Sequence, residues 1–143
     1  MKIRLANYGD AGDLIQAVTE IFSDFWSAAQ IEESLRGERT PVFVLEDDAA
    51  NIRGFLFWRQ GVDIDEIDLI AVAPELRRQG WARALWDYAL ESALSSDVVE
   101  LELRADNTLA KRFYERLGFR FIRRRRAYYP AAVDALIFQW RSE

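Results

Sequence analysis

Residues 69–85 of the chain read LIAVAPELRRQGWARAL, and this stretch predicts a strand, a short basic loop and a helix. The run Ile70–Val72 is apolar and favours a strand, which Pro74 ends because proline has no N–H to donate to a sheet. Apolar residues then recur at helical spacing from Ala82 to Ala93. A strand that leads directly into a helix is typical of an α/β fold.

The loop Arg77-Arg78-Gln79-Gly80 lies at the predicted start of the helix. A helix N-terminus presents backbone N–H groups without partners and the positive end of a dipole, and both attract anions. Gly80 would let a ligand approach the backbone closely, and the two arginines add positive charge. The loop therefore predicts a cradle for a pyrophosphate, although it lacks the pattern of a Walker loop or of a dinucleotide-binding turn. The alternative is a surface loop whose arginines only cap the helix.

The composition indicates one ordinary globular domain. The chain has 143 residues, of which 50% are hydrophobic and 30% charged, so we expect a single domain over residues 1–143. No apolar run approaches the ~20 residues that span a bilayer. No signal peptide precedes the first strand, so we expect a cytoplasmic protein that does not contact a membrane. The net charge of −5 argues against direct binding to nucleic acid.

The residue types that are missing limit the chemistry. The sequence has no cysteine and no histidine, which excludes thiol nucleophiles, imidazole bases and metal sites built on these ligands. Lysine occurs only at Lys2 and Lys111, and arginine cannot act as a base. A carboxylate is therefore the leading candidate for any general base near neutral pH, and no metal is expected.

The remaining pattern predicts a mixed sheet with flanking helices. The strands over 64–72 and 98–104 are joined by the helix after the basic loop, so we expect them to run parallel. Asp10, and a capping box of Ser27 and Gln30, predict the starts of the first two helices. The expected strands are 3–5, 42–46, 52–60, 64–72, 98–104, 119–126 and 135–140, the other expected helices are 11–22, 28–36 and 107–118, and 127–134 is expected to be a loop.

A second motif begins at Asn107 and reads NTLAKRFYERLGF over residues 107–119. Asn107 is expected to cap a helix that contains Tyr114 and ends at Gly118. This motif and the loop over 77–82 together resemble the conserved motifs of the GNAT superfamily of N-acetyltransferases, in the order of that family. The resemblance implies the GNAT fold, an α/β fold whose mixed central sheet contains a splayed parallel strand pair that holds acetyl-CoA.

Three further segments resemble one branch of this superfamily. LELRADN at 101–107 and RRAYYP at 125–130 are similar to the RimI type, the bacterial ribosomal-protein-alanine N-acetyltransferases, and so is Phe25-Trp26-Ser27. Those enzymes acetylate the N-terminal α-amine of a protein. The chain departs from their pattern at Trp81 in the basic loop, at Asp106 and in a shorter loop after Pro130. In that family the loop after Pro130 helps to shape the acceptor site, so this last departure bears on the acceptor more than on the acetyl donor.

The resemblance implies a role for each motif residue. Glu102 would be the general base that takes a proton from the amine, and Tyr114 would give a proton to the departing CoA thiolate. The strand backbone would pair with the pantetheine amides of acetyl-CoA, and the loop with the helix start would hold its pyrophosphate. The residues implied to bind acetyl-CoA are Ile70, Ala71, Val72, Arg77, Arg78, Gln79, Gly80, Trp81, Ala82, Arg83 and Asn107.

The pattern alone leaves other roles open for these side chains. Alternation in 98–104 places Glu100, Glu102 and Arg104 on one polar face, where Glu102 could simply be a solvated carboxylate. Tyr114 could serve core packing, as well as or instead of proton donation. The resemblance also implies Glu66 as the competing base, because many GNAT enzymes use a carboxylate on that strand to order a water.

Two charged clusters and one aromatic segment also have two interpretations each. The acidic residues in 63–68 are interpreted as a solvated hairpin, with an electrostatic seat for a basic peptide or amine as the alternative. The arginines at 123–126 are interpreted as a solvated strand edge, with binding of ribosomal RNA as a weaker alternative. Phe25-Trp26-Ser27 either packs at the entry of a helix or forms one wall of a substrate channel.

Together these features predict an N-acetyltransferase that moves an acetyl group from acetyl-CoA to a primary amine by direct attack. The expected acceptor is a protein N-terminal α-amine, with a ribosomal protein as a candidate partner. The alternatives are a small-molecule amine, such as a polyamine or an aminoglycoside, and a non-catalytic acyl-CoA-binding module on the same fold.

Overall fold

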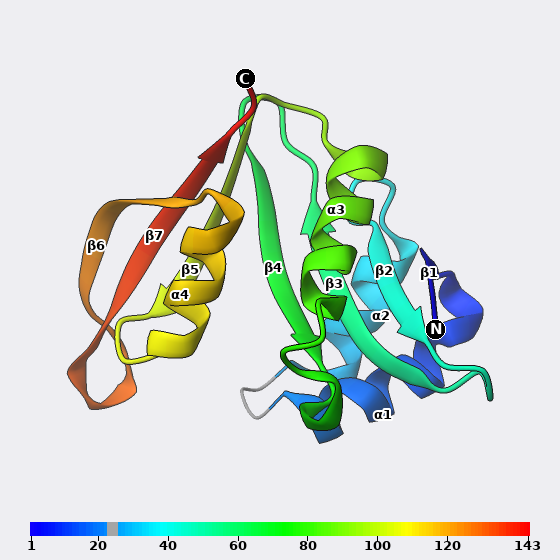
Figure 1. Cartoon of the computed structure of the whole chain (residues 1–143). Coiled ribbons are helices and arrows are strands. Elements are labelled where there is room, and N and C mark those ends of the chain that lie inside the picture. The colour runs from blue at the N-terminus through cyan, green and yellow to red at the C-terminus, as the bar shows by residue number, and fades with distance from the viewer. Residues whose placement is uncertain (23–25) are drawn as a thin grey trace. The chain divides into compact units, whose positions relative to one another are not determined.

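A computed structural model describes residues 1–22 and 26–143, and these form two compact units. The first unit contains Met1–Gln60 and Ile67–Leu94, and the second contains Gly61–Glu66 and Ser95–Glu143. The strands follow the order β1-β2-β3-β4-β5-β7-β6, and β4 passes from the second unit into the first (Figure 1). The mixed α/β sheet predicted from the sequence is thereby confirmed, whereas a single domain over 1–143 stays a prediction.

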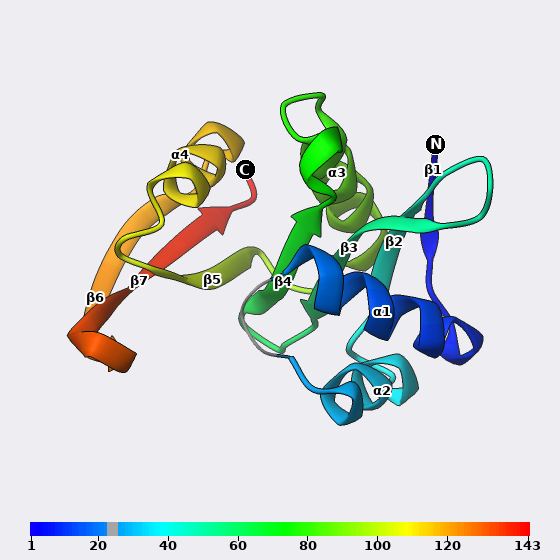
Figure 2. The ribbon, with the colours of Figure 1, turned by 90° about the horizontal axis from the view of Figure 1, so that it is seen from below.

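In the first unit, helices cover both faces of the strands (Figure 2). α1 and α2 lie on one face and α3 lies on the other. Strands β1, β2 and β3 pair antiparallel in sequence order, as predicted for the second and third of them. The elements are β1 (Lys2–Leu5), α1 (Ala11–Ile21), α2 (Ala28–Arg36), β2 (Val42–Glu46), β3 (Ile52–Arg59), β4 (Asp65–Val72) and α3 (Trp81–Ala93), with short 3-10 turns at Tyr8–Asp10 and Pro74–Leu76.

Strand β3 is apolar on both faces because helices cover both. Phe55 and Phe57 belong to the core cluster formed with α1 and α2, and Trp26 packs its ring 4.9 Å from that of Phe57. Trp58 points to the other side, where its ring lies 5.9 Å from Trp86 of α3. The contact of Trp26 favours packing as its role, while Phe25 of the same predicted segment lies outside the described residues.

The helix starts of the first unit confirm one capping prediction and correct another. Gln30 N–H donates to Ser27 Oγ at 3.1 Å and Ser27 N–H to Gln30 Oε1 at 2.8 Å, which is the predicted capping box of α2. The prediction that the Asp10 side chain caps α1 was wrong. Its carboxylate instead accepts hydrogen bonds from the N–H of Asn7 and from the Arg4 guanidinium, each at 2.9 Å, so Asn7 caps a short turn ahead of the helix.

The second unit contains an antiparallel three-stranded sheet, one helix and the start of β4. Its elements are β5 (Val98–Arg104), α4 (Thr108–Leu117), β6 (Arg120–Tyr129) and β7 (Val133–Arg141), with β7 paired to β5 on one side and to β6 on the other. Helix α4 lies against this sheet (Figure 1). β4 pairs parallel with β5, as predicted, through the pairs Asp65↔Val99 and Glu66↔Glu100.

The loop expected over 127–134 was wrong, because β6 and β7 extend into it. β6 runs to Tyr129 and β7 begins at Val133, with only the 3-10 turn Pro130–Ala132 between them. The strand continues past an irregular step in which Ala127 has a φ of 49°. Asp134 bridges this step, since its Oδ1 accepts the N–H of Ala127 at 2.7 Å. The hairpin therefore carries Tyr128 and Tyr129 on strand backbone rather than on a free loop.

Candidate functional site

The turn from β4 into α3 leaves the start of the helix open. Gly80 is the N-cap residue with a φ of 86°, and no side chain caps this helix. The helix ladder begins with the N–H of Ala84 donating to the carbonyl of Gly80 at 3.0 Å. The N–H groups of Trp81, Ala82 and Arg83 consequently have no partner within the helix and point out of its N-terminus.

The space in front of this N-terminus suits an anion. A Cβ placed on Gly80 would meet nothing within 4 Å, so a ligand could approach the backbone there. Arg77, Arg78 and Arg83 are all exposed around it. The Gln79 side chain is engaged otherwise, because its Nε2 donates to the carbonyl of Glu75 at 2.9 Å and holds the turn. These residues fit the predicted pyrophosphate cradle, and the backbone and arginines would hold the phosphates.

The last residues of β4 deviate from a regular strand. Burial alternates along β4 up to Leu69, but Ile70 and Ala71 are both half-buried before Val72 is buried again. Gly54 of β3 lies so close that a Cβ there would meet Val72 Cγ1 at 2.9 Å and the carbonyl of Ala71 at 3.1 Å. One edge of β4 thus packs tightly on β3, while the assignment of Ile70, Ala71 and Val72 to pantetheine binding stays a prediction.

Two glutamates on β5 have different surroundings. Glu100 has an 11% exposed side chain with both oxygens engaged, one 3.5 Å from Arg123 and the other accepting from Gln139 Nε2 at 2.8 Å. Glu102 is 35% exposed, and its Oε1 accepts from Arg125 Nη1 at 2.6 Å. Among the described residues, none engages Oε2 of Glu102. Of the two, Glu102 therefore keeps one oxygen without a partner among the described residues.

Helix α4 holds the other two predicted residues of this unit. Asn107 caps the helix as predicted, since its Oδ1 accepts the N–H of Ala110 at 3.1 Å. Tyr114 is half-buried, with ring contacts to Phe113 at 5.3 Å and Phe119 at 5.6 Å. Burial raises the pKa of the Tyr114 hydroxyl above its usual range, so this group holds its proton firmly.

The acidic cluster at 63–68 is not one solvated patch, because Asp65 is fully buried. Its carboxylate accepts hydrogen bonds from the N–H of Gly61 at 3.3 Å and from the N–H and hydroxyl of Ser95 at 2.9 and 2.7 Å. Asp68 forms an ion pair with Arg59. Glu66 is exposed and lies opposite Glu100 in the parallel pairing. Asp65 is thus a structural clamp between two turns, which the charge pattern did not predict.

The arginine run lies on the edge strand β6, as predicted, and also forms ion pairs that were not predicted. Arg123 and Arg125 reach Glu100 and Glu102 across β7, and Arg124 reaches Asp134 at 2.8 Å. The contact of Arg125 with Glu102, the predicted base, is one that the sequence did not predict. The only signal for it is the matching two-residue spacing of the glutamates on β5 and the arginines on β6.

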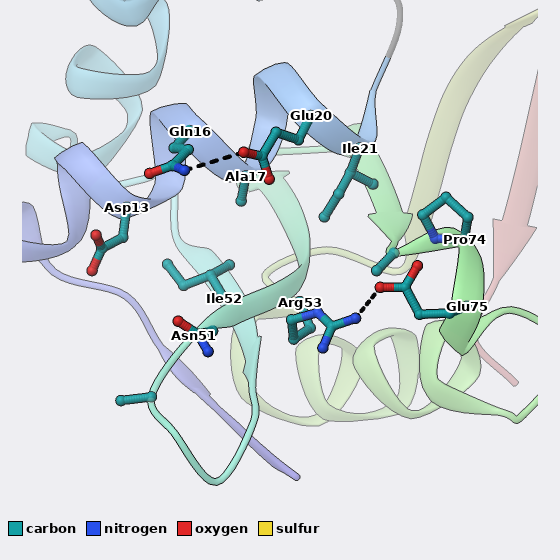
Figure 3. Close-up of a pocket in the computed structure, with 12 residues that line it drawn as sticks. Asp13, Gln16, Ala17, Glu20, Ile21, Asn51, Ile52, Arg53, Pro74 and Glu75 are labelled. Carbon is teal, nitrogen blue, oxygen red and sulfur yellow. Dashed lines mark hydrogen bonds and ion pairs between the residues drawn. The ribbon is translucent and has the colours of Figure 1, made fainter.

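A cavity of about 490 Å³ lies in the first unit, beside α1 (Figure 3). Asp13, Glu20 and Glu75 bring carboxylates to it, and Glu75 forms an ion pair with Arg53. None of the residues predicted to bind acetyl-CoA or to act in catalysis lines this cavity.

In the part of the chain that the structure describes, no helix is long and apolar enough to cross a membrane. No group of three or more acidic side chains among those residues could hold a metal ion.

Comparison with known proteins decides the family. Residues 7–128, most of the chain, match the acetyltransferase (GNAT) domain. This chain belongs to that family. The fold agrees, because the GNAT domain described above superimposes on the crystal structure of the ribosomal-protein-S18-alanine N-acetyltransferase from Escherichia coli with a TM-score of 0.88. The two are 28% identical, over 98% of this chain and 92% of that one.

Curated relatives match about half of this GNAT domain. The chain is 41% identical over 83 residues to the ribosomal protein bS18-alanine N-acetyltransferase of Salmonella typhimurium. This match covers 53% of this chain and 56% of that enzyme. Over 80 residues the chain is 44% identical to naa20, the catalytic subunit of the N-terminal acetyltransferase B complex of Schizosaccharomyces pombe, covering 52% and 44%. The chain thus spans about half the length of the curated relatives it matches.

Proposed function

We propose that this GNAT domain transfers an acetyl group from acetyl-CoA to the N-terminal α-amine of a protein, as in the ribosomal-protein-alanine type. The observation that carries the proposal is the carboxylate of Glu102, which is fixed through Oε1 and leaves Oε2 without a partner among the described residues. The matched relatives support the acceptor class, since one is named for N-acetylation of an alanine of ribosomal protein bS18 and the other belongs to an N-terminal acetyltransferase complex.

Glu102 acts as the general base. The α-ammonium of a peptide has a pKa of roughly 8, so most of it is protonated near neutral pH and must lose a proton before it can attack. Oε2 of Glu102 takes that proton, directly or through one water. The amine nitrogen then bonds to the thioester carbonyl carbon, and the bond between that carbon and sulfur breaks. The second proton of the nitrogen leaves to solvent, which also replaces the proton that Tyr114 gives to the thiolate. A covalent enzyme intermediate is not required, in keeping with the absence of cysteine.

Tyr114 completes the reaction as the proton donor to the thiolate that leaves. A donor for this step must keep its proton until the carbon–sulfur bond breaks. Burial raises the pKa of Tyr114, so its hydroxyl is protonated over the whole working range of pH. The open start of α3, with Gly80 and the exposed arginines, would hold the phosphates of acetyl-CoA meanwhile.

A small-molecule amine is a weaker acceptor candidate. That alternative depends on the acidic residues at 63–68 acting together as an electrostatic seat. Asp65 is buried in hydrogen bonds to two turns and Asp68 is paired with Arg59, so at least two of the four carboxylates are already engaged. What remains of the cluster is a poor basis for selecting a polyamine or an aminoglycoside.

Release of CoA thiol tests the proposal. The acceptors are peptides with a free N-terminal alanine, the same peptides with a blocked N-terminus and an internal lysine, and a panel of polyamines and aminoglycosides. The variants are Glu102→Gln and, as a matched control on the same strand, Glu100→Gln. We expect activity on the free N-terminus alone, and a loss of kcat of about 10²-fold or more in Glu102→Gln with acetyl-CoA binding retained.

The outcomes separate the alternatives. Glu100→Gln should lower stability without lowering kcat, because both oxygens of Glu100 are already engaged in structural contacts. Activity on small amines only would contradict the acceptor but not the acetyl transfer. A wild-type rate in Glu102→Gln would move the base to Glu66. Tight binding of CoA with no turnover of any acceptor would show a non-catalytic module.

A further inference from the structure

Arg125 binds the candidate base from two strands away. β7 lies between β5 and β6, with Glu102 opposite Ile137 and Arg125 opposite Ala135. The Arg125 side chain therefore crosses β7 to bring Nη1 within 2.6 Å of Glu102 Oε1. A contact of this length between an arginine and a carboxylate is a strong, charge-assisted hydrogen bond.

A second contact fixes the arginine itself. The Arg125 guanidinium carbon lies 4.8 Å from the centroid of the Tyr128 ring, a cation–π distance. Tyr128 packs edge-on against Tyr129 at 5.1 Å, and Tyr129 lies 5.3 Å from the guanidinium of Arg104. The Arg125 guanidinium thus contacts both Glu102 and the Tyr128 ring, and Tyr128 in turn packs on Tyr129.

The neighbouring ion pair of Arg123 with Glu100 differs from that of Arg125 with Glu102 in how the carboxylate is held. Arg123 and Glu100 occupy equivalent positions two residues earlier on each strand, but Gln139 also binds the second oxygen of Glu100. Glu100 is therefore held through both of its oxygens. At Glu102, residue 137 on β7 is isoleucine, which offers no such donor, so Arg125 alone orients the carboxylate.

We propose that Arg125 is a positioning residue for Glu102: it fixes Oε1 so that Oε2 faces the acceptor amine. The inference rests on the proposed function, because it takes Glu102 as the base. Arg125 itself neither gives nor takes a proton, since arginine stays charged throughout. Its contribution is orientation, which lowers the probability that the carboxylate turns away from the reacting nitrogen.

The test compares Arg125→Gln and Arg125→Lys with Arg124→Gln in steady-state assays on a peptide with a free N-terminal alanine. Arg124 is the matched control, because it is the next residue of β6 and forms an ion pair with Asp134 instead. We expect Arg125→Gln to lower kcat about 10-fold, while KM for the peptide and Kd for acetyl-CoA stay within about twofold. Arg125→Lys should recover part of the rate, since it restores the charge without the planar fork. Arg124→Gln should keep the wild-type kcat.

A double variant distinguishes positioning from a general structural effect. Arg125→Gln should slow the enzyme no further when Glu102→Gln is already present, because there is then no base to orient. An equal loss in both backgrounds, a rise in KM at constant kcat, or an unchanged rate in Arg125→Gln would overturn the inference while Glu102→Gln remains slow. If Glu102→Gln turns over at the wild-type rate, the proposed base has failed and the inference with it.

Discussion

Helices α3 and α4 each follow a strand, yet their starts are built in opposite ways. At α4, Asn107 Oδ1 accepts the N–H of Ala110 and closes the N-terminus. At α3 the N-cap position is Gly80, which has no side chain to do this, and the N-terminus is open. A capping side chain contributes about 1 kcal/mol to stability. The chain forgoes that stabilisation at α3, and the backbone N–H groups there remain available to an anionic ligand.

Among the helix starts, the largest effect is expected when a side chain is added at Gly80, the open start of α3. Gly80→Ala places a Cβ in the space in front of the N-terminus and forces alanine into a φ of 86°. We expect Kd for acetyl-CoA to rise about 10-fold, because the phosphates lose their close approach to the backbone. Isothermal titration calorimetry measures this Kd.

Gly118→Ala is the matched control for strain. Gly118 ends α4 with a φ of 100°, and a Cβ there would only touch Trp140 at an ordinary 3.5 Å. Both alanines should lower the free energy of unfolding by about 1–2 kcal/mol, the usual penalty of left-handed backbone. Only Gly80→Ala should weaken acetyl-CoA binding. An equal loss of affinity in the two variants would assign the effect to strain and contradict a phosphate-binding site at Gly80.

A middle-sized effect is expected at Asp10, directly before α1, whose carboxylate forms an ion pair with Arg4 and accepts the N–H of Asn7. The Arg4 guanidinium, and then the N–H of Asn7, lower the pKa of Asp10 below its ordinary value of 3.8. The stabilisation of the fold by the ionised Asp10 carboxylate is therefore complete above pH 3.8. It is lost as the pH falls through the lower pKa that Asp10 has in the folded state. Asp10→Ala should lower the free energy of unfolding by about 1.5 kcal/mol at pH 7.

Urea unfolding from pH 7 down to pH 2 checks this second prediction. The difference between wild type and Asp10→Ala should shrink as the pH drops below 3.8, because wild-type Asp10 then becomes protonated and loses its ion pair with Arg4. A difference that stays constant to pH 2 would mean that the carboxylate charge does not stabilise the fold.

The smallest effect is expected at Asn107, which has two suggested tasks. Asn107→Ala removes the cap and should lower the free energy of unfolding by about 1 kcal/mol. Asn107→Ser keeps an oxygen that caps the helix but has no amide, so its stability should stay near that of wild type. If the amide also contacts acetyl-CoA, both variants raise Kd for it by about threefold, the loss of one modest hydrogen bond. Wild-type affinity in Asn107→Ser would leave Asn107 only its capping task.

The sequence by itself determined the features that depend on neighbours along the chain. The capping box of Ser27 and Gln30, the cap at Asn107 and the helix end at Gly118 join residues within about one helical turn, so spacing alone identifies them. The same holds for the open start of α3, because glycine after a basic loop and before a helical stripe already specifies it. The strand over 98–104 was predicted with its correct bounds for a similar reason, its strict alternation.

The tertiary structure decided what depends on strand order and register. Arg125 lies 23 residues from Glu102, and the two meet only because β7 inserts between β5 and β6 in one register. Asp65 is a clamp rather than a solvated charge because Ser95, 30 residues later, folds back onto it. The charge pattern is the same whether or not these partners meet. A shift of one residue in strand pairing would move every side chain to the other face, and that choice is made by packing of the whole sheet.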